Sequence, residues 1–320
     1  MYKRQTLTLG VFNVWLGMNS LSGASQISSI LFMIVIVLLT LEYLGRRSRK
    51  FHEKYSGASY TPTQTVSGVK NSLLFLICLI PLSLGFIIPV SILLNFVIKG
   101  YSIINFIEIF QITLSSISLA FISSSFIMLL SLLMIIVGAY KSNNFQKILI
   151  FFASSGYAFP GTILAVGIVV FVGWLNDLIY FRMSYAVGGF IILLFAYSIR
   201  FLAVGNGAIT SGISRIHPNL LDASRTMGVS FFKSIRKIIL PLLYTNLLVG
   251  GILVFVDILK ELPITLLLRP FNFETLATYV YQYASDEMLE ESAFAALIIV
   301  IAGLGPVIFL NRTITKSIKN

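Results

Sequence analysis

The sequence predicts an all-α polytopic membrane protein with about seven transmembrane helices. Hydrophobic residues make up 57% of the 320 residues and charged residues only 11%, with a mean hydropathy of +0.92. A soluble domain carries roughly 25% charged residues, about twice the share found here. Apolar runs of about 18 residues or more recur along the chain, and each is long enough to cross a hydrocarbon core of about 30 Å.

Seven apolar runs meet this length criterion, and we expect each to be a helix that crosses the membrane. The predicted spans are Ile27 to Leu44, Leu73 to Ile98, Ile112 to Tyr140, Ile148 to Leu175, Tyr185 to Val204, Leu242 to Leu262 and Ala293 to Leu310. The last six follow one another closely, whereas the first is set apart by a polar linker.

The positions of the basic residues predict the orientation of the chain. If the loop 45–72 is cytoplasmic, then so are 140–147, 200–241 and the tail after 310, and these segments hold 17 of the 23 Lys and Arg residues. Loops rich in Lys and Arg stay in the cytoplasm. The N-terminus is therefore expected outside and the C-terminus inside.

Composition and missing motifs exclude several classes of function. The net charge of +11 follows from the cytoplasmic loops, so nucleic acid is not an expected partner. The one cysteine, Cys78, lies in an apolar run and leaves no disulfide or cysteine-based metal site. No Gly-x4-Gly-Lys-Ser/Thr stretch occurs, so the chain has no loop of this kind to bind ATP. His52 and His217 belong to no catalytic constellation, and neither an enzyme nor a cofactor or metal site is predicted.

The loop from Gly45 to Asn71 divides the chain into two parts. Arg46, Arg47, Arg49 and Lys50 form a basic run that is followed by a Ser-, Thr-, Gly- and Pro-containing linker. This pattern is typical of an anchor at the end of a span, and contact with anionic membrane lipid is the alternative. We expect residues 1–71 to be an outer segment, one transmembrane helix and a cytoplasmic linker, and residues 72–320 to be a six-span domain.

Pro160 and Gly161 interrupt the fourth predicted span. Proline has no N–H and leaves a carbonyl that neighbouring helices or water must satisfy, so such breaks face protein or a pathway. Near the end of the sixth span, Asp257, Lys260 and Glu261 lie at the spacing of side chains that pair on a helix. They are interpreted either as a cation site on a translocation pathway or as a pair that braces an outer gate, and we favour the brace.

The stretch from Asp222 to Pro241 is the longest polar interruption with helical character. A short helix is expected from Leu220, a bend at Gly228, and then a second helix that is basic and amphipathic and ends at Leu240-Pro241. Glycine within a helix costs about 1 kcal/mol relative to alanine, so Gly228 indicates a bend. A surface of this kind is suited to docking rather than to burial in lipid.

This stretch resembles the cytoplasmic motif of binding-protein-dependent ABC importer permeases, Glu-Ala-Ala-x3-Gly-x9-Ile-x-Leu-Pro. The matching residues are Asp222, Ala223, Ser224, Gly228, Ile238, Leu240 and Pro241, with Asp in place of Glu and Ser in place of the second Ala. The resemblance implies that this segment is a coupling helix that docks on a cytoplasmic ABC ATPase dimer. It also implies that residues 72–320 are the six-span permease core and that a substrate-binding protein delivers the cargo from outside.

Two further stretches, 157–165 and 254–277, are similar to permeases of the ferric-iron type. Those permeases usually have two homologous six-span halves, and residues 1–71 resemble the end of a first half. The resemblance therefore implies ferric iron as the cargo and a second permease half as a partner. Thiamine, polyamine and phosphonate are alternative cargoes, and a nonfunctional fragment of an interrupted permease is a further alternative.

Overall fold

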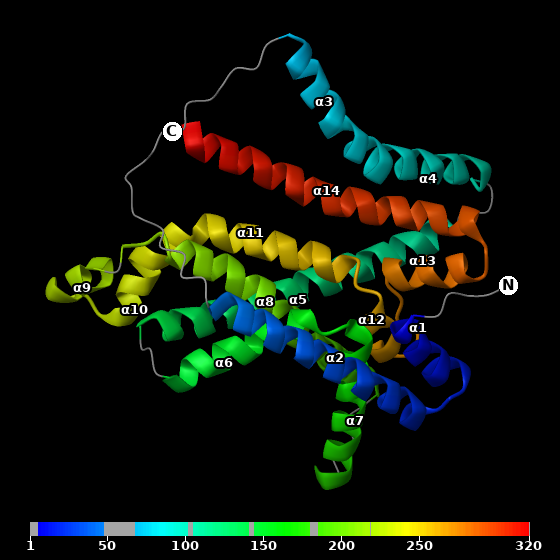
Figure 1. Cartoon of the computed structure of the whole chain (residues 1–320), viewed down its shortest axis with the longest axis horizontal. Coiled ribbons are helices and arrows are strands. Elements are labelled where there is room, and N and C mark those ends of the chain that lie inside the picture. The colour runs from blue at the N-terminus through cyan, green and yellow to red at the C-terminus, as the bar shows by residue number, and fades with distance from the viewer. Residues whose placement is uncertain are drawn as a thin grey trace.

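The computed structural model of the chain is a bundle of long helices, and its described residues contain no strand (Figure 1). The structure describes residues 6–47, 68–101, 105–140, 144–179, 185–217 and 219–319. Its α-helices are α1 (Leu7–Phe12), α2 (Leu21–Arg47), α3 (Val69–Leu82), α4 (Ile88–Lys99), α5 (Phe106–Tyr140), α6 (Asn144–Ser155), α7 (Gly161–Ile179), α8 (Tyr185–Ile213), α9 (Asn219–Thr226), α10 (Phe231–Ser234), α11 (Leu240–Leu259), α12 (Pro263–Leu268), α13 (Leu276–Ser285) and α14 (Leu289–Lys319).

The centre of the bundle is formed by α5, α8 and α11. Their buried side chains make one continuous core that includes Ile127, Tyr197, Phe201 and Leu243. The helices approach closely where one of them presents glycine: a Cβ at Gly205 would lie 2.4 Å from Ser131 Oγ. In lipid the hydrophobic effect does not drive helices together, so their association depends on close van der Waals packing. Small residues at the contacts allow this close approach.

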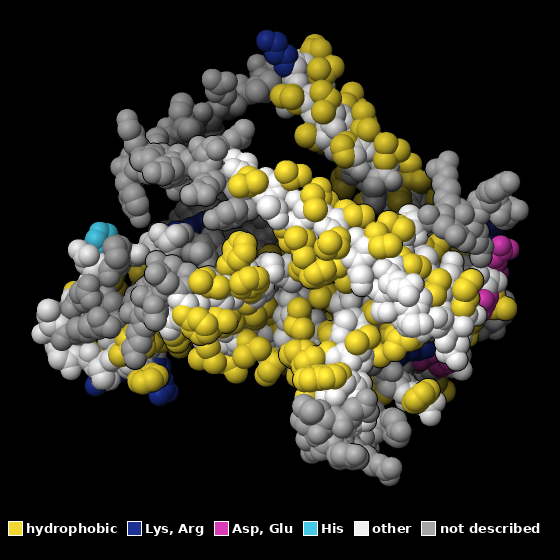
Figure 2. Space-filling view, turned by 60° about the horizontal axis from the view of Figure 1, so that its bottom comes forward, with side chains coloured by type: hydrophobic (Ala, Val, Ile, Leu, Met, Phe, Trp, Pro, Cys, Tyr) yellow, Lys and Arg dark blue, Asp and Glu magenta, His cyan; other side chains and the backbone are white. Residues whose placement is uncertain are grey.

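The predicted all-α transmembrane architecture is confirmed. Six helical segments among the described residues are long and apolar enough to cross a membrane, and a bent pair of helices would add a seventh if it counts as one span. Hydrophobic side chains cover the middle of the molecule, and Asp and Glu gather near one end, whereas Lys and Arg appear at the opposite end, at the top of the view and beside the acidic groups (Figure 2). Of the predicted loop from Gly45 to Asn71, residues 48–67 lie outside the described residues, whereas its first residues belong to the end of α2 and its last to the start of α3.

The fourth predicted span is not a straight helix. Helix α6 ends in a turn of 3₁₀ helix, Gly156–Ala158, and α7 then leaves at 118° to the segment before it. Pro160 lies between them, directly before the first residue of α7. An N–H at the start of a helix has no partner within that helix, so proline removes no helical hydrogen bond there. The predicted break at Pro160-Gly161 is therefore present, and it is a sharp bend rather than a kink.

The fifth predicted span was placed too short. We expected a helix ending at Val204 and a cytoplasmic loop that began at Arg200, but α8 continues without interruption to Ile213. Arg200 thus lies half-way along a span and does not count as a loop residue. The predicted cytoplasmic segments keep 16 Lys and Arg residues without it, so the tally still favours the predicted orientation, which stays a prediction.

The two ends of the described chain contain the same helix–turn–helix unit. Thr6 caps α1 and Thr275 caps α13, each by accepting a hydrogen bond from the backbone N–H three residues later. Each unit then turns through one residue with positive φ, Asn19 at 51° and Glu287 at 64°, before a long helix begins. The units are 269 residues apart at their caps and 268 apart at their turns.

The hydrogen bonds of the turns match as well. Ser20 N donates to Val14 O in the first unit, and Met288 N donates to Tyr283 O in the second. The first unit has one more residue between its two hydrogen-bonded residues than the second. The helix before its turn ends in a π-helix, Asn13–Gly17. A π turn spans one residue more than an α turn, so it accommodates the extra residue. The chain therefore carries one structural unit twice, packed on α7 as α1–α2 and on α4 and α5 as α13–α14.

The bend between α6 and α7 depends on glycine at position 156. A Cβ there would lie 1.9 Å from the carbonyl oxygen of Ile199 in α8, and that oxygen belongs to the backbone. Gly156→Ala should therefore destabilise the protein by about 1–3 kcal/mol, because either the bend or α8 has to move. The measurement is the midpoint of thermal unfolding of the purified protein in detergent.

The matched control is Gly173→Ala in α7, where a Cβ would have no atom within 4 Å. Alanine is favoured over glycine in a helix by roughly 0.5–1 kcal/mol, so the control should be neutral or slightly stabilising. Equal midpoints for the two variants would show that the close approach at Gly156 does not matter.

Candidate functional site

A helix pair at one end of the bundle forms the first candidate site. Helices α9 and α10 project beyond the other helices at the end opposite α13 (Figure 1). Helix α10 runs through a π-helical turn, Ile235–Ile239, directly into α11, so residues 231–259 form one helical segment. At 1.5 Å per residue this segment is about 43 Å long. The projecting pair is thus rigidly attached to a span.

The predicted bend between the two helices is present. Gly228 has φ of 75°, in the left-handed region that suits glycine. Met227 N donates to Ala223 O and Val229 N donates to Ser224 O, which closes the end of α9 around that glycine. This is the common C-terminal cap of a helix, and it satisfies carbonyls that would otherwise lack partners.

A buried hydroxyl pair joins the two arms of the bend. Ser224 Oγ lies 2.8 Å from Ser234 Oγ, and both side chains are buried. Ser224 is the position where the resembled motif has alanine, so the hydroxyl is accommodated here by a second serine on α10. Ser234 was not among the predicted residues, since its contact lies ten positions away along the chain.

The other predicted residues of this stretch take different places. Ala223 is exposed, Ile238 and Leu240 are half-buried, and Pro241 lies exposed in the first turn of α11. Asp222 belongs to α9, and its side chain lies outside the described part of the structure.

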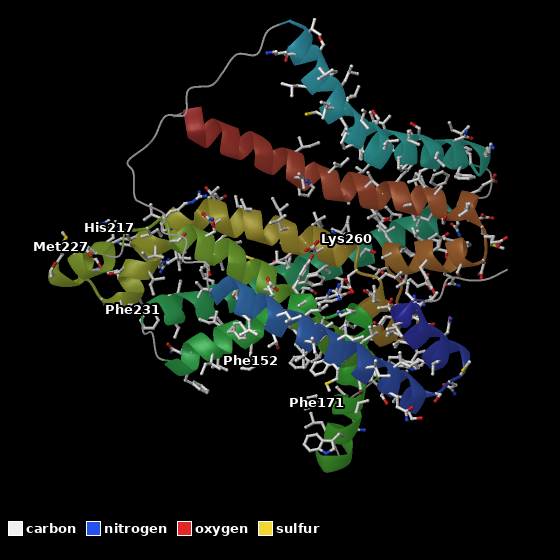
Figure 3. All side chains as sticks on the ribbon, viewed as in Figure 1. Phe152, Phe171, His217, Met227, Phe231 and Lys260 are labelled. Carbon is white, nitrogen blue, oxygen red and sulfur yellow. The ribbon has the colours of Figure 1, made fainter. Side chains whose placement is uncertain are left out.

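The surface of the pair combines two large apolar side chains with basic ones. Met227 and Phe232 are 82% and 81% exposed, and Lys233, Arg236 and Lys237 are exposed beside them. Met227 and Phe231 mark this end of the molecule in Figure 3, whereas Lys260 lies beyond the other end of α11. Exposed apolar side chains rimmed by charge are typical of a protein-binding surface.

The second candidate site lies at the bend between α6 and α7, and it brings together Pro160, Gly161 and Glu261. Glu261 is only 7% exposed, and its Oε2 lies 3.5 Å from Arg200 Nε in α8. Arg200 Nη1 also donates to Phe159 O, directly before Pro160, at 3.2 Å. A Cβ at Gly161 would lie 2.7 Å from Glu261 Oε1 and 2.8 Å from Arg200 Nη1, so a larger residue there would require these two side-chain ends to shift.

Asp257 and Lys260 form a separate ion pair. Lys260 Nζ lies 2.9 Å from Asp257 Oδ1, and the lysine side chain is 61% exposed. Glu261 pairs with Arg200, although all three predicted residues are neighbours in sequence. An exposed pair such as Asp257 and Lys260 contributes roughly 0–1 kcal/mol, whereas a buried ion pair is costly to break.

Arg200 is the main residue that the sequence prediction missed. It was taken as the start of a cytoplasmic loop, although an arginine amid the apolar residues of 190–204 is itself a signal. Charged residues within a span are expensive and almost always pair with another charge or with backbone carbonyls. Arg200 does both, because it pairs with Glu261 and donates to Phe159 O.

This arrangement favours a brace over a cation site. The Glu261 carboxylate is neutralised by Arg200, and Ile264 N also donates to its Oε1 at 3.4 Å. The described residues contain no group of three or more His, Cys, Asp or Glu side chains that could hold a metal ion. Asp257 and Glu261 line neither of the two grooves described below.

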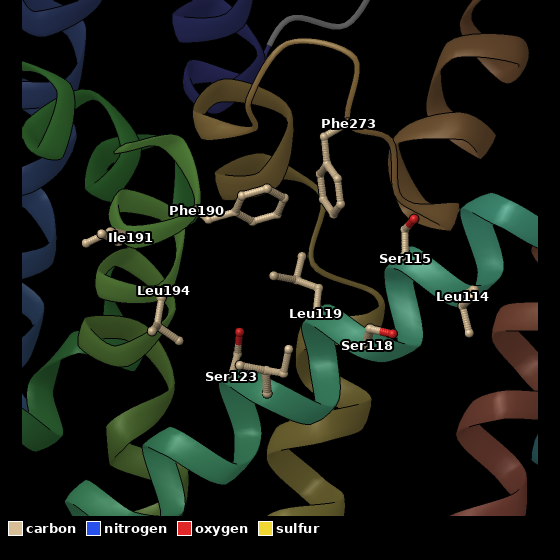
Figure 4. A pocket seen from close by; sticks show the side chains of 10 residues that line it. Leu114, Ser115, Ser118, Leu119, Ser123, Phe190, Ile191, Leu194 and Phe273 are labelled. Atoms are coloured by element: carbon tan, nitrogen blue, oxygen red, sulfur yellow. The ribbon is translucent and has the colours of Figure 1, made fainter. Parts of the chain in front are cut away.

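Two grooves of about 480 Å³ each open on the surface of the described helices. The first lies between α5 and α8 and is lined by Ser115, Ser118 and Leu119 on one side and by Phe190 and Phe273 on the other (Figure 4). The second lies between α2 and α6–α7, beside the stacked rings of Phe32 and Phe159. Both are mainly apolar and carry a few serine hydroxyls.

Comparison with protein families finds one match. The family described as the binding-protein-dependent transport system inner membrane component matches residues 135–320. This region contains the broken span, both candidate sites and α11 to α14.

Comparison with individual proteins finds similarity over most of the chain. It is 24% identical over 316 residues to the Fe(3+)-transport system permease protein FbpB 2 of Haemophilus influenzae, which covers 96% of this chain. The chain spans 60% of the length of that relative. The fold is similar to a bacterial ABC transporter involved in the import of the acidic polysaccharide alginate, with a TM-score of 0.58, 15% identity, and coverage of 76% of this chain and 95% of that chain.

The turn at Gly228 should not accept alanine. A Cβ there would have no atom within 4 Å, so only the positive φ opposes substitution. For an L-residue this conformation costs roughly 1–2 kcal/mol, and asparagine adopts it more readily. We expect Gly228→Ala to loosen the end of α9 and Gly228→Asn to do so less, with faster limited proteolysis between residues 222 and 234 as the measurement.

The control for this series is Gly207→Ala in α8, where a Cβ also has open space but φ is not positive. Its proteolysis rate should match that of the parent protein. If Gly228→Ala is cleaved no faster than the parent protein, the positive φ of the turn is not what requires glycine at this position.

Proposed function

Because the chain belongs to the binding-protein-dependent transport system inner membrane component family, we propose that it is a permease subunit of an ATP-driven ABC importer. The observation that carries this proposal is the family match over residues 135–320, which includes the projecting helix pair. The subunit itself hydrolyses nothing. It moves cargo from an external substrate-binding protein across a bacterial inner membrane by alternating access.

We propose that α9 and α10 are the coupling element that docks on a cytoplasmic ABC ATPase dimer. Met227 and Phe232 supply exposed apolar anchors, and the basic residues beside them supply charge for orientation. Closure of the ATPase on ATP would push the pair, and the continuous segment 231–259 would carry that push into the membrane. A push of this kind shifts the protein only if the partner binds its two states with different free energies.

Ferric iron is the cargo that we propose. The support is the 24% identity to the Fe(3+)-transport permease of Haemophilus influenzae, together with the stretches that resemble ferric-iron permeases. Thiamine, polyamine and phosphonate are the alternatives, because residues that contact a cargo do not follow from the fold.

We further propose that residues 1–71 end one permease half and that residues 72–320 form another. The repeated unit supports this division, because α1–α2 has the caps and the turn of α13–α14, which complete the second half. The two halves would then be related by the repeat, and the unit α1–α2 would reach across to α7. The DNA upstream distinguishes a joined first half from a separate chain and from a nonfunctional fragment.

At the outer side, we propose that Pro160, Gly161, Asp257, Lys260 and Glu261 belong to a gate rather than to a cargo site. The support for this proposal is the two ion pairs described above, in which Arg200 neutralises the Glu261 carboxylate and Lys260 neutralises the Asp257 carboxylate. Exposed carboxylates near the α13–α14 turn face the expected outer side, where a substrate-binding protein would dock.

The coupling proposal predicts that charged substitutions at the exposed anchors weaken ATPase binding. Met227→Asp and Phe232→Asp should each cost about 2 kcal/mol or more, roughly 30-fold in affinity, because each removes an apolar anchor. The measurement is co-purification of the ATPase with the assembled transporter from membranes.

Phe271→Asp is the control for this experiment, since Phe271 is 92% exposed but follows α12, near the other end of α11. It should leave co-purification unchanged. Gly228→Pro and Asp222→Lys should abolish transport while the protein stays in the membrane, and normal uptake in both variants would contradict the coupling role.

The cargo proposal predicts ATP-dependent uptake of radiolabelled ferric iron by cells that express the complete transporter and lack other ferric uptake. The Gly228→Pro variant should reduce that uptake to background, because its coupling element is broken. Uptake of thiamine, polyamine or phosphonate in the same cells, with iron at background, would replace iron by that cargo.

A further inference from the structure

An arginine in the middle of a span connects three parts of the structure that are far apart in the sequence. Arg200 belongs to α8, Phe159 ends the turn after α6, and Glu261 follows α11. The guanidinium contacts both partners, through Nη1 and Nε respectively. Arginine is suited to this because its planar group presents several donors in fixed directions.

The first of these contacts satisfies the break in the fourth span. Phe159 is in extended conformation and is followed by Pro160, so no helix supplies a partner for its carbonyl. Arg200 Nη1 donates to this carbonyl at 3.2 Å. In a membrane an unsatisfied carbonyl costs several kcal/mol, so the bend as seen depends on Arg200.

The second contact attaches the end of α11 to the same guanidinium. Glu261 Oε2 forms an ion pair with Arg200 Nε at 3.5 Å, and Glu261 Oε1 accepts a hydrogen bond from Ile264 N in the first turn of α12. Thr265 Oγ1 donates to Glu261 O at 2.6 Å and also contacts the hydroxyl of Tyr197, one turn before Arg200. The connection between α11 and α12 is therefore held against α8 at two successive turns.

The other end of α11 is the projecting helix pair. Residues 231–259 form one helical segment, so displacement of α10 moves the end that carries Glu261. A Cβ at Gly161, at the start of α7, would lie 2.7 Å from Glu261 Oε1 and 2.8 Å from Arg200 Nη1, so both ionic groups lie close against the start of α7. A displacement of α11 must then either move the bend with it or separate Glu261 from Arg200.

We propose that Arg200 is a positioning residue that latches the α6–α7 bend to the end of α11, and that transport requires this ion pair to open. The inference rests on the proposed function in one respect, that partner motion enters through α9 and α10. With the pair intact, the start of α7 is closed against α12. With the pair broken, the end of α11 is no longer held to Arg200, Gly161 is released, and the bend opens to water.

Accessibility of position 162 tests the latch. Thr162 is buried directly after Gly161, and its hydroxyl has no hydrogen-bond partner among the described residues, so Thr162→Cys loses none. Cys78 is the one native cysteine, and Cys78→Ser gives a cysteine-free background. The measurement is the rate at which a small methanethiosulfonate labels Thr162→Cys in the full chain in membrane vesicles.

In this background, Arg200→Gln and Glu261→Gln should each raise the labelling rate by about tenfold or more, because each breaks the pair. Single variants leave one buried charge unpaired and can fail to fold. The double variant Arg200→Gln with Glu261→Gln leaves no such charge and should fold, yet it should label as fast as the singles. A folded double variant as slow as the parent would overturn the proposal.

Arg269→Gln is the matched control. Arg269 Nη1 also pairs with a glutamate, Glu274, at 3.1 Å and donates to the backbone carbonyl of Phe273, but in the connection between α12 and α13. It should leave labelling at position 162 unchanged. Equal acceleration by Arg269→Gln would mean that any lost ion pair loosens the protein, which would also overturn the latch.

A further arm separates this proposal from the proposed function. In the assembled transporter with its ATPase, a non-hydrolysable ATP analogue should accelerate labelling of Thr162→Cys when Arg200 and Glu261 are both unchanged. Acceleration by the double variant but not by the analogue supports the latch and contradicts coupling through α9 and α10. Acceleration by the analogue but not by the double variant supports coupling and contradicts the latch.

Discussion

Backbone polar groups inside a membrane must be satisfied without water, and the break between α6 and α7 is where this chain meets that constraint most severely. The bend leaves the carbonyl of Phe159 without a helical partner, and the protein supplies one from the middle of another span. A buried guanidinium in turn requires an anion, which Glu261 provides. Gly156 and Gly161 then follow, because neither α8 nor the ion pair leaves space for a Cβ.

The two candidate sites lie at opposite ends of one continuous helical segment, and their construction differs accordingly. At the docking end, the bend at Gly228 is closed by backbone hydrogen bonds and a serine pair, while large apolar side chains are left exposed. At the other end the groups are charged and buried. The first arrangement suits a surface that a protein covers, and the second suits an internal contact with two distinct states.

Local signals explain what the sequence predicted. The spans follow from apolar length, the bend at Gly228 from a glycine in a helical pattern, and the break at Pro160 from the missing N–H. Arg200 was misplaced because its partners are 41 and 61 positions away, so nothing beside it indicates that its charge is neutralised. Ser234 was not predicted for the same reason, because its partner Ser224 lies ten positions away in the sequence. The roles of Arg200 and Ser234 depend on contacts with other segments of the chain, whereas the predicted spans and bends depend on patterns within a single segment.

The π-helical turn at Asn13–Gly17 has a consequence for how the repeated unit tolerates change in length. It holds one residue more than the matching turn before Met288, yet the cap before it and the left-handed residue after it are kept. A single insertion in a helix ordinarily rotates everything beyond it by about 100°, which would turn the packed face of the next span toward lipid. Here the extra residue is accommodated within the π-helical turn, and α2 packs against α7. Alignments of the two units therefore need a one-residue gap at this turn and nowhere else between the cap and the start of the long helix.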